Sequence, residues 1–239
     1  MPDLRGQAIA LLRAAANGEA VALPFLTRAE LAALQLLGRN QLLDEAEIRW
    51  WEALPEDVRL HLGGAVLRGL MARGLVRLRG AWPDRPPPGS IVPVEPSPGL
   101  ALVLAVRMVP AFVVECLAEG APIRRLWGPA GTPDPRCVLA EDLEGEGVHR
   151  FGLSSLDGGI DRIASWACAG PSKGADATEV RIVDVGWPGE TARPPQRWVL
   201  AASAGAVVGR REGSGGGAGE ARPLTAPAMR TQLKLLLRS

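Results

Sequence analysis

The sequence contains no tyrosine and few histidines and cysteines, the side chains that zinc sites use most. Its two histidines, His61 and His149, lie far apart, and its three cysteines, Cys116, Cys137 and Cys168, are widely spaced. No CxxC, HxxxH or HExxH spacing occurs, so we expect no metal site and no cofactor. An odd number of thiols among apolar neighbours is typical of reduced, buried cysteines in a reducing compartment.

A long uninterrupted apolar run is also missing. The N-terminus carries Asp3 and no basic segment ahead of an apolar one, which argues against a secretory signal peptide. The most apolar stretch, residues 100–117, contains Arg107, Pro110 and Glu115, and charged side chains are costly at the centre of a bilayer. We therefore expect a cytoplasmic protein without a membrane-spanning segment.

Neither sign of charge is in excess. Lys and Arg number 27 and Asp and Glu 26, so the net charge of +1 provides no overall field that would attract nucleic acid or an anionic membrane. Lysine occurs only at Lys173 and Lys234, and the abundance of Arg, Ala, Gly and Pro is typical of a high-GC bacterial genome. Arginine content alone therefore does not indicate phosphate binding, and any basic site must be local.

Helical patterns fill the first third of the chain. Thr27 and Glu30 form a capping box, which predicts the start of a helix. Pro55 and Gly74 predict the two ends of a longer helix, since proline is favoured in the first helical turn and glycine just after the last. Residues 75–78 then alternate apolar and basic side chains, as a short strand does.

These patterns predict an α+β protein in three parts. Residues 1–80 form a helical domain whose order of elements is that of a winged helix, and residues 81–98 form a Pro-rich linker. Residues 99–239 form an α+β domain of duplicated antiparallel β-sheet units, each closed by a helix. The two units span about residues 99–170 and 175–239.

A short internal repeat suggests this duplication. Residues 136–140 resemble residues 197–201, which lie 61 positions later. A chance match of five residues is the alternative, because the composition is biased. In both copies the match is preceded by one strand pattern and followed by a second strand and an amphipathic helix. In the first copy these are residues 111–116, 148–153 and 156–168. In the second copy they are residues 180–185, 207–211 and 226–237.

One catalytic pattern occurs. Residues 170–174 read Gly-Pro-Ser-Lys-Gly and match the G-x-S-x-G motif of the nucleophile elbow, with Ser172 as the nucleophile. An elbow follows a strand and opens a helix, whereas here a predicted helix precedes the motif and a predicted strand follows it. We therefore predict that the chain is not an enzyme, and a serine hydrolase is the third and weakest alternative.

Acidic residues precede His149 in the predicted hairpin. Glu141, Asp142, Glu144 and Glu146 allow an imidazole–carboxylate pair with His149. A solvated hairpin is the interpretation we prefer, because acidic residues and glycines are common at turn tips.

DNA binding is the alternative function for the N-terminal part. In a winged helix, arginines of the longer helix and of the wing would contact phosphates. The acidic residues Glu56 and Asp57 at the start of that helix argue against this function. The candidate phosphate contacts are Arg59, Arg68, Arg73, Arg77 and Arg79.

Tryptophan supplies most of the aromatic surface, with seven residues against three phenylalanines. Trp50 and Trp51 are adjacent in a predicted helix, so both cannot face the same core, and an exposed tryptophan can anchor a protein interface. We take Trp50, Trp51 and Trp187 as candidate protein-binding residues; contact with the second domain is the alternative role.

Several segments of the second half show a family resemblance. They are Pro110–Glu115, Arg125–Gly128, Val148–Phe151, the helix pattern Leu156–Trp166 and the strand set that ends in Ala226–Leu237. Together, residues 99–239 resemble the EspG family of type VII secretion chaperones. The resemblance implies a quasi-twofold β-sheet with helices, and a chaperone that holds the hydrophobic tip of a PE–PPE heterodimer. Residues 1–80 are longer and more helical than the opening of that family.

The sequence therefore favours a cytoplasmic protein-binding chaperone or adaptor with a helical protein as partner, such as a type VII secretion substrate. A winged-helix transcriptional regulator is the alternative, with nucleic acid as its partner. We expect no membrane association.

Overall fold

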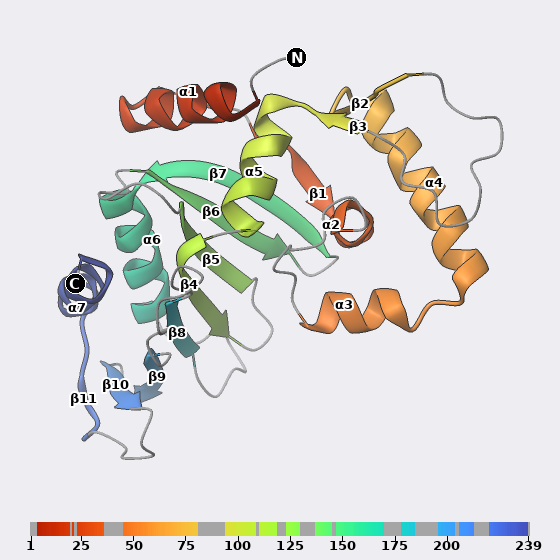
Figure 1. Ribbon diagram of the computed structural model, residues 1–239. Helices are drawn as coiled ribbons and strands as arrows, with labels where there is room; N and C mark the ends of the chain where they lie inside the picture. The colour runs from red at the N-terminus through yellow and green to blue at the C-terminus, as the bar shows by residue number, and fades with distance from the viewer. Residues whose placement is uncertain are drawn as a thin grey trace.

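A nine-stranded antiparallel sheet with helices on both faces forms the body of the protein (Figure 1). The computed structural model describes residues 4–19, 21, 23–35, 45–80, 94–108, 110–118, 123–129, 137–144, 147–169, 178–184, 196–203, 206–212 and 220–238. The predicted α+β class is confirmed.

The described helices are α1 (Leu4–Ala16), α2 (Arg28–Gln35), α3 (Glu45–Glu52), α4 (Glu56–Ala72), α5 (Pro98–Met108), α6 (Leu156–Cys168) and α7 (Ala226–Arg238). The strands are β1 (Phe25–Thr27), β2 (Val76–Leu78), β3 (Val94–Pro96), β4 (Pro110–Ala118), β5 (Ile123–Pro129), β6 (Cys137–Glu144), β7 (Val148–Ser155), β8 (Thr178–Asp184), β9 (Gln196–Ser203), β10 (Ala206–Glu212) and β11 (Arg222–Pro223).

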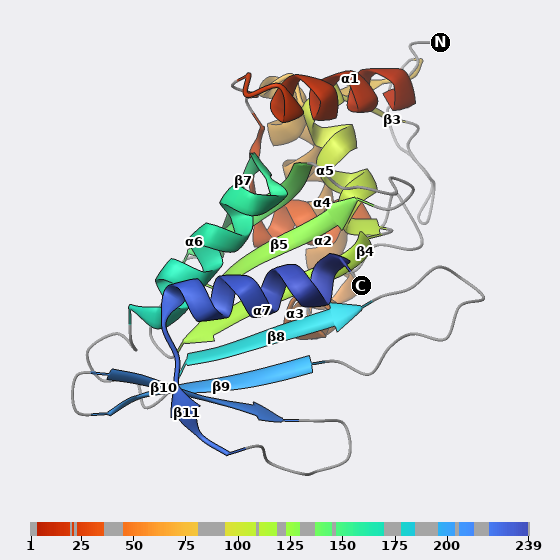
Figure 2. The same cartoon turned by 90° about the vertical axis from the view of Figure 1, so that its left-hand side faces the viewer.

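The large sheet is a duplication. Its strand order is β1-β7-β6-β5-β4-β8-β9-β10-β11, so β4 and β8 lie side by side at the centre. A twofold axis perpendicular to the sheet between these two strands relates β4, β5, β6, β7 and α6 to β8, β9, β10, β11 and α7. Both helices then fall on the same face, where α6 and α7 contact each other (Figure 2).

The predicted repeat was wrong in its alignment. It equated β6 with β9, whereas the twofold axis equates β5 with β9 and β6 with β10. The structural offset is also larger, because β8 begins 68 residues after β4 and α7 begins 70 residues after α6. The match at an offset of 61 residues therefore reflects similar strand composition and not equivalent position.

Side chains alternate between two cores, one on each face of the sheet. Val138, Val180 and Leu200 point to the face covered by α6 and α7 and belong to one cluster. Leu139 and Trp127 point to the opposite face and pack with residues of α5, α2 and α4 in the second cluster. Gly159 of α6 is required by this packing, since a Cβ atom there would lie 2.9 Å from Val138.

The N-terminal helices join the sheet through β1, which pairs with β7 at its edge. The predicted capping box is present at the start of α2: the Thr27 amide donates to Glu30 Oε2 at 2.7 Å and the Glu30 amide donates to Thr27 Oγ1 at 3.2 Å. Leu26 and Leu31 are buried in the same cluster as Leu139 of the sheet. The helical segment and the sheet therefore share one core.

The Pro-rich segment ends earlier than predicted. Residues 94–96 form β3, which pairs with β2 in a small two-stranded sheet. Pro98 then starts α5, where the Ser97 hydroxyl accepts from the Leu100 amide at 3.4 Å. Proline suits these places because neither an edge strand nor the first helical turn needs every backbone N–H.

In the parts of the chain that the structure describes, no helix is both long enough and apolar enough to cross a membrane.

Candidate functional site

The two adjacent tryptophans of α3 lie in different environments. Trp51 is buried, whereas Trp50 is half-buried and has the Arg28 guanidinium 5.0 Å above its ring. The two ring centroids are 6.1 Å apart at an angle of 51°. Of these two residues, Trp50 is the one that offers surface to a partner. The third candidate, Trp187, lies outside the described residues.

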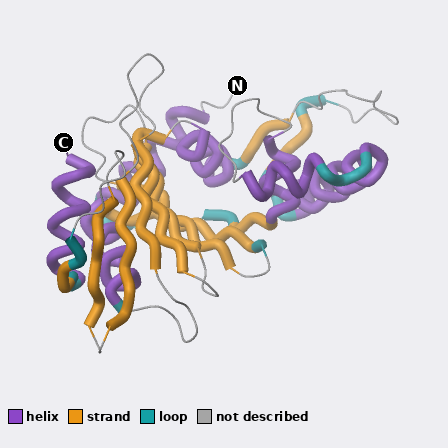
Figure 3. The backbone as a smooth tube through the Cα atoms, turned by 90° about the horizontal axis from the view of Figure 1, so that it is seen from below, coloured by secondary structure: helices purple, strands orange, loops and turns teal. Residues whose placement is uncertain are grey.

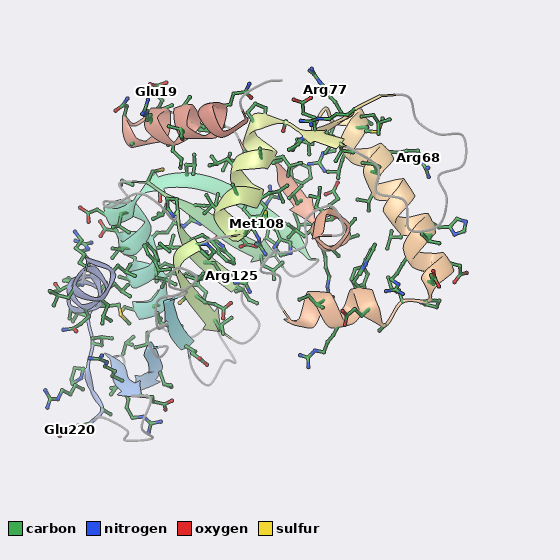
Figure 4. The ribbon with its side chains drawn as sticks, viewed as in Figure 1. Glu19, Arg68, Arg77, Met108, Arg125 and Glu220 are labelled. Carbon is green, nitrogen blue, oxygen red and sulfur yellow. The ribbon has the colours of Figure 1, made fainter. Side chains whose placement is uncertain are left out.

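The structure does not bring the five candidate arginines together. Arg59 and Arg68 are nine residues apart on α4, which at about 100° per residue places them on opposite sides of the helix. Arg77 and Arg79 are exposed on and after β2. Figure 4 shows Arg68 and Arg77 at separate places on the outer edge.

Arg73 lies at the surface but is paired with other residues of this chain. Its Nη1 contacts Glu30 Oε1 at 2.7 Å, its Nη2 donates to the Phe25 carbonyl at 2.6 Å, and its guanidinium lies 4.3 Å above the Phe25 ring. It links the end of α4 to the capping box of α2, and this contact accounts for its position without a phosphate.

The most unusual chemistry is a buried charged cluster between α5 and the sheet. Glu141 and His149 are 0% exposed, Arg107 is 3% exposed and Arg125 is 4% exposed. Arg107 comes from α5, and the other three come from β6, β7 and β5. Figure 4 shows Arg125 in the interior of the molecule.

Glu141 is the centre of this cluster. Its Oε1 receives hydrogen bonds from Arg107 and, at 2.6 Å, from His149 Nδ1. Its Oε2 accepts from Trp127 Nε1 at 2.6 Å. Arg125 Nη1 lies 3.8 Å from Oε1, and Arg125 Nε donates to Glu115 Oε2 at 2.7 Å.

These contacts determine the ionisation of Glu141. Burial by itself raises the pKa of the carboxyl group, but Arg107, the hydrogen bond from His149 and the charge of Arg125 together lower the pKa to about 2. The group is therefore an anion at neutral pH, and His149 must carry its proton on Nδ1 to donate to it.

The solvated hairpin preferred around His149 was wrong, and the alternative, an imidazole–carboxylate pair, is present with Glu141. Glu141 lies within β6 and not at the turn tip, and it shares a sheet face with His149. A second signal in the sequence could have found the rest of the cluster: the lone charge of Arg107 in an otherwise apolar helix needs a buried partner. Both Glu141 oxygens already accept hydrogen bonds from protein donors, so the cluster fastens α5 to the sheet.

Burial raises the pKa values of Cys116, Cys137 and Cys168. Thiols with raised pKa values are poor nucleophiles at neutral pH.

No group of three or more potential metal ligands is found in the described part of the chain. Ser172 and the rest of the G-x-S-x-G motif lie outside the described residues.

One half of the α5 face of the sheet has no helix over it among the described elements. We call this the open sheet face, which is formed by β8, β9 and β10 on the side away from α6 and α7 (Figure 3). Its described side chains are partly or fully exposed: Glu179, Val199, Val208, Arg210 and Glu212.

The open sheet face continues the row of the buried cluster. Across the strands, Glu141 is opposite Arg125, Arg125 opposite Glu115, and Glu115 opposite residue 181. Residue 181 is opposite residue 197, and both positions are arginine in the sequence. A single transverse row of charged positions thus crosses from the covered half of the face to the open half.

Comparisons with known proteins point to one fold. No protein-family model and no curated protein matches the sequence. The chain is similar to a solved structure, that of the Mycobacterium tuberculosis type VII secretion system chaperone EspG5 in complex with a PE25–PPE41 dimer. The TM-score is 0.52 at 10% sequence identity, and the match covers 90% of this chain and 95% of that chain. At this identity the likeness is one of fold, and it supports the EspG-like architecture that the sequence suggested.

Proposed function

We propose that this protein is a non-catalytic chaperone or adaptor that binds a helical segment of another protein. The observation that carries the proposal is the likeness in fold to EspG5 over nearly the full length of both chains, since that structure is a chaperone in complex with a protein dimer. The buried cluster supports a non-catalytic role, because its charged groups are paired with one another.

The open sheet face is the surface we assign to the partner. The same face already accepts one helix, α5, over its other half, and the Arg107–Glu141 pair shows how such a helix can be anchored to the charged row. Val199 and Val208 provide apolar contact area there, and Arg210 and Glu212 lie beside them.

A secretion substrate is the partner class we propose. EspG5 is a type VII secretion chaperone, and the structure that matches contains the PE25–PPE41 dimer. We extend this to the present chain as a cytoplasmic chaperone that holds a helical substrate before its export.

Reconstitution from purified components tests the proposal. Proteins that co-purify with the chain from its native host would be identified, expressed separately and titrated by isothermal calorimetry. We expect a helical protein that binds with defined stoichiometry and a Kd in the micromolar range or below. Absence of any stoichiometric partner, or binding only to DNA with a steep salt dependence, would contradict the proposal and favour the regulator.

Surface variants locate the binding site. Val199→Glu and Val208→Glu each place a charge on the open sheet face and are expected to weaken partner binding at least tenfold. Leu235→Glu is the matched control, since Leu235 is 62% exposed on α7, on the other side of the sheet. Equal loss in the control would show that the open sheet face is not the site. Trp50→Ala reports whether α3 contributes a second contact.

A further inference from the structure

Helix α4 presents an outward face that is not explained by packing within the chain. Asp57, His61 and Arg68 are exposed, and Gly64 lies between them at the spacing i, i+4, i+7 and i+11. This spacing places all four residues on one side of the helix. Leu60 flanks this stripe and is 54% exposed, which is high for a leucine.

Gly64 leaves room for a close approach. A Cβ atom at this position would meet only the flexible end of Arg68, at 3.6 Å. Glycine is less favourable than alanine within a helix, and no contact inside the described protein requires it here. A second helix that packs across Gly64 would provide a reason for this residue.

The charged residues of the stripe are complementary to those of a second copy of the same stripe. Asp57 lies at the N-terminal end of α4 and Arg68 lies 11 residues later, and among the described residues neither side chain has an ion-pair partner. If a second α4 packs antiparallel about a twofold axis near residues 62 and 63, each Asp57 faces the Arg68 of the other copy. The same axis places His61 of each copy over Gly64 of the other, and Leu60 beside Ala65.

We propose that the protein forms a homodimer through antiparallel packing of α4 against α4 of a second copy. A twofold interface must be complementary to itself, and the Asp57–Arg68 pattern meets this condition only in the antiparallel orientation. Parallel packing would place like charges together. The charge pattern therefore selects a second copy as the occupant of this face.

The interface is small, and the dimer is accordingly weak. A stable protein interface buries about 1,200–2,000 Å² in total, and one pair of 17-residue helices lies at or below the lower end of this range. We expect a Kd in the micromolar range that rises with salt, because two exposed ion pairs contribute. Helix α4 and the strands β8, β9 and β10 lie at opposite ends of the molecule (Figure 1), so dimerisation leaves the open sheet face free.

Sedimentation analysis of the full chain between about 5 and 500 µM tests the dimer. Asp57→Arg and Arg68→Asp each place like charges in contact and are expected to raise the dimer Kd at least tenfold. The double variant D57R/R68D restores both pairs in the reversed sense and is expected to return the Kd to within about threefold of the parent. A chain that stays monomeric at every concentration, or a dimer unaffected by the single reversals, would overturn the proposal.

A glycine pair separates dimerisation from folding. Gly64→Leu fills the space at the helix crossing and is expected to abolish the dimer without lowering the melting temperature, since leucine favours the helix more than glycine does. Gly69→Leu is the matched control, because a Cβ atom at Gly69 meets nothing within 4 Å and this residue lies outside the stripe. Equal dimerisation of both variants would contradict α4 packing, and it would leave the proposed partner binding untouched.

Discussion

The two halves of the α5 face of the sheet use the same kind of residue in opposite ways. In the covered half, Glu141 and Arg125 are buried and every charge is paired with protein groups. In the open half, Arg210 and Glu212 form an ion pair of 2.6 Å with side chains that are 45% and 27% exposed. The difference shows the effect of a covering helix: where α5 packs over the row, the charged side chains are buried and hold the helix to the sheet.

The largest expected effect on stability comes from a substitution in the covered half. Glu141→Ala leaves Arg107 buried without its anion and is expected to lower the free energy of unfolding by about 3–5 kcal/mol. Urea unfolding followed by circular dichroism measures the change. A loss below about 1 kcal/mol would show that the cluster does not hold α5 to the sheet.

Acid should weaken the covered half next. The pKa of Glu141 is lower in the folded protein, at about 2, than its ordinary value of 4.5. Its contribution is therefore complete above pH 4.5 and is lost as the pH falls toward 2, by about 3 kcal/mol in total. Unfolding curves between pH 6 and 2.5 should show a shallower decline for Glu141→Gln than for the parent chain. Parallel declines would assign the acid sensitivity to other carboxylates.

A smaller change removes one donor of the cluster. Trp127→Phe deletes the indole N–H that donates to Glu141 Oε2 and is expected to cost about 1.5–3 kcal/mol, the range for hydrogen bonds to charged groups. Trp166→Phe is the matched control, because this half-buried indole lies on the other face of the sheet, under Arg124. Equal losses in urea unfolding would indicate a packing effect of indole volume and not a hydrogen bond.

The smallest effect is expected in the open half. Arg210→Ala removes an exposed ion pair and should change the free energy of unfolding by less than about 1 kcal/mol. The same variant should weaken binding of the proposed partner, which calorimetry measures. A loss of several kcal/mol would show that charges in the open half stabilise the fold as much as those in the covered half, and the two halves would then not differ.

The sequence by itself determined most of the elements, because their signals are local. Thr27 and Glu30 mark the start of α2, Pro55 and Gly74 bracket α4, and the pattern of residues 156–168 predicts α6 to the residue. The α+β class followed from the order of these elements, whereas the duplication was suggested by a five-residue match that the structure does not align. Capping and hydrophobic periodicity act over a few residues, so one chain is enough to read them.

The tertiary structure alone decided which residues meet. It joined Arg107 to Glu141 across 34 positions, buried His149, and took Arg73 out of the set of free arginines by placing it on Glu30. It also corrected the repeat, since strands of similar composition can be equated only by their place in the sheet. Long-range pairing depends on register and on which face a helix covers, and a single sequence does not encode either in a local pattern.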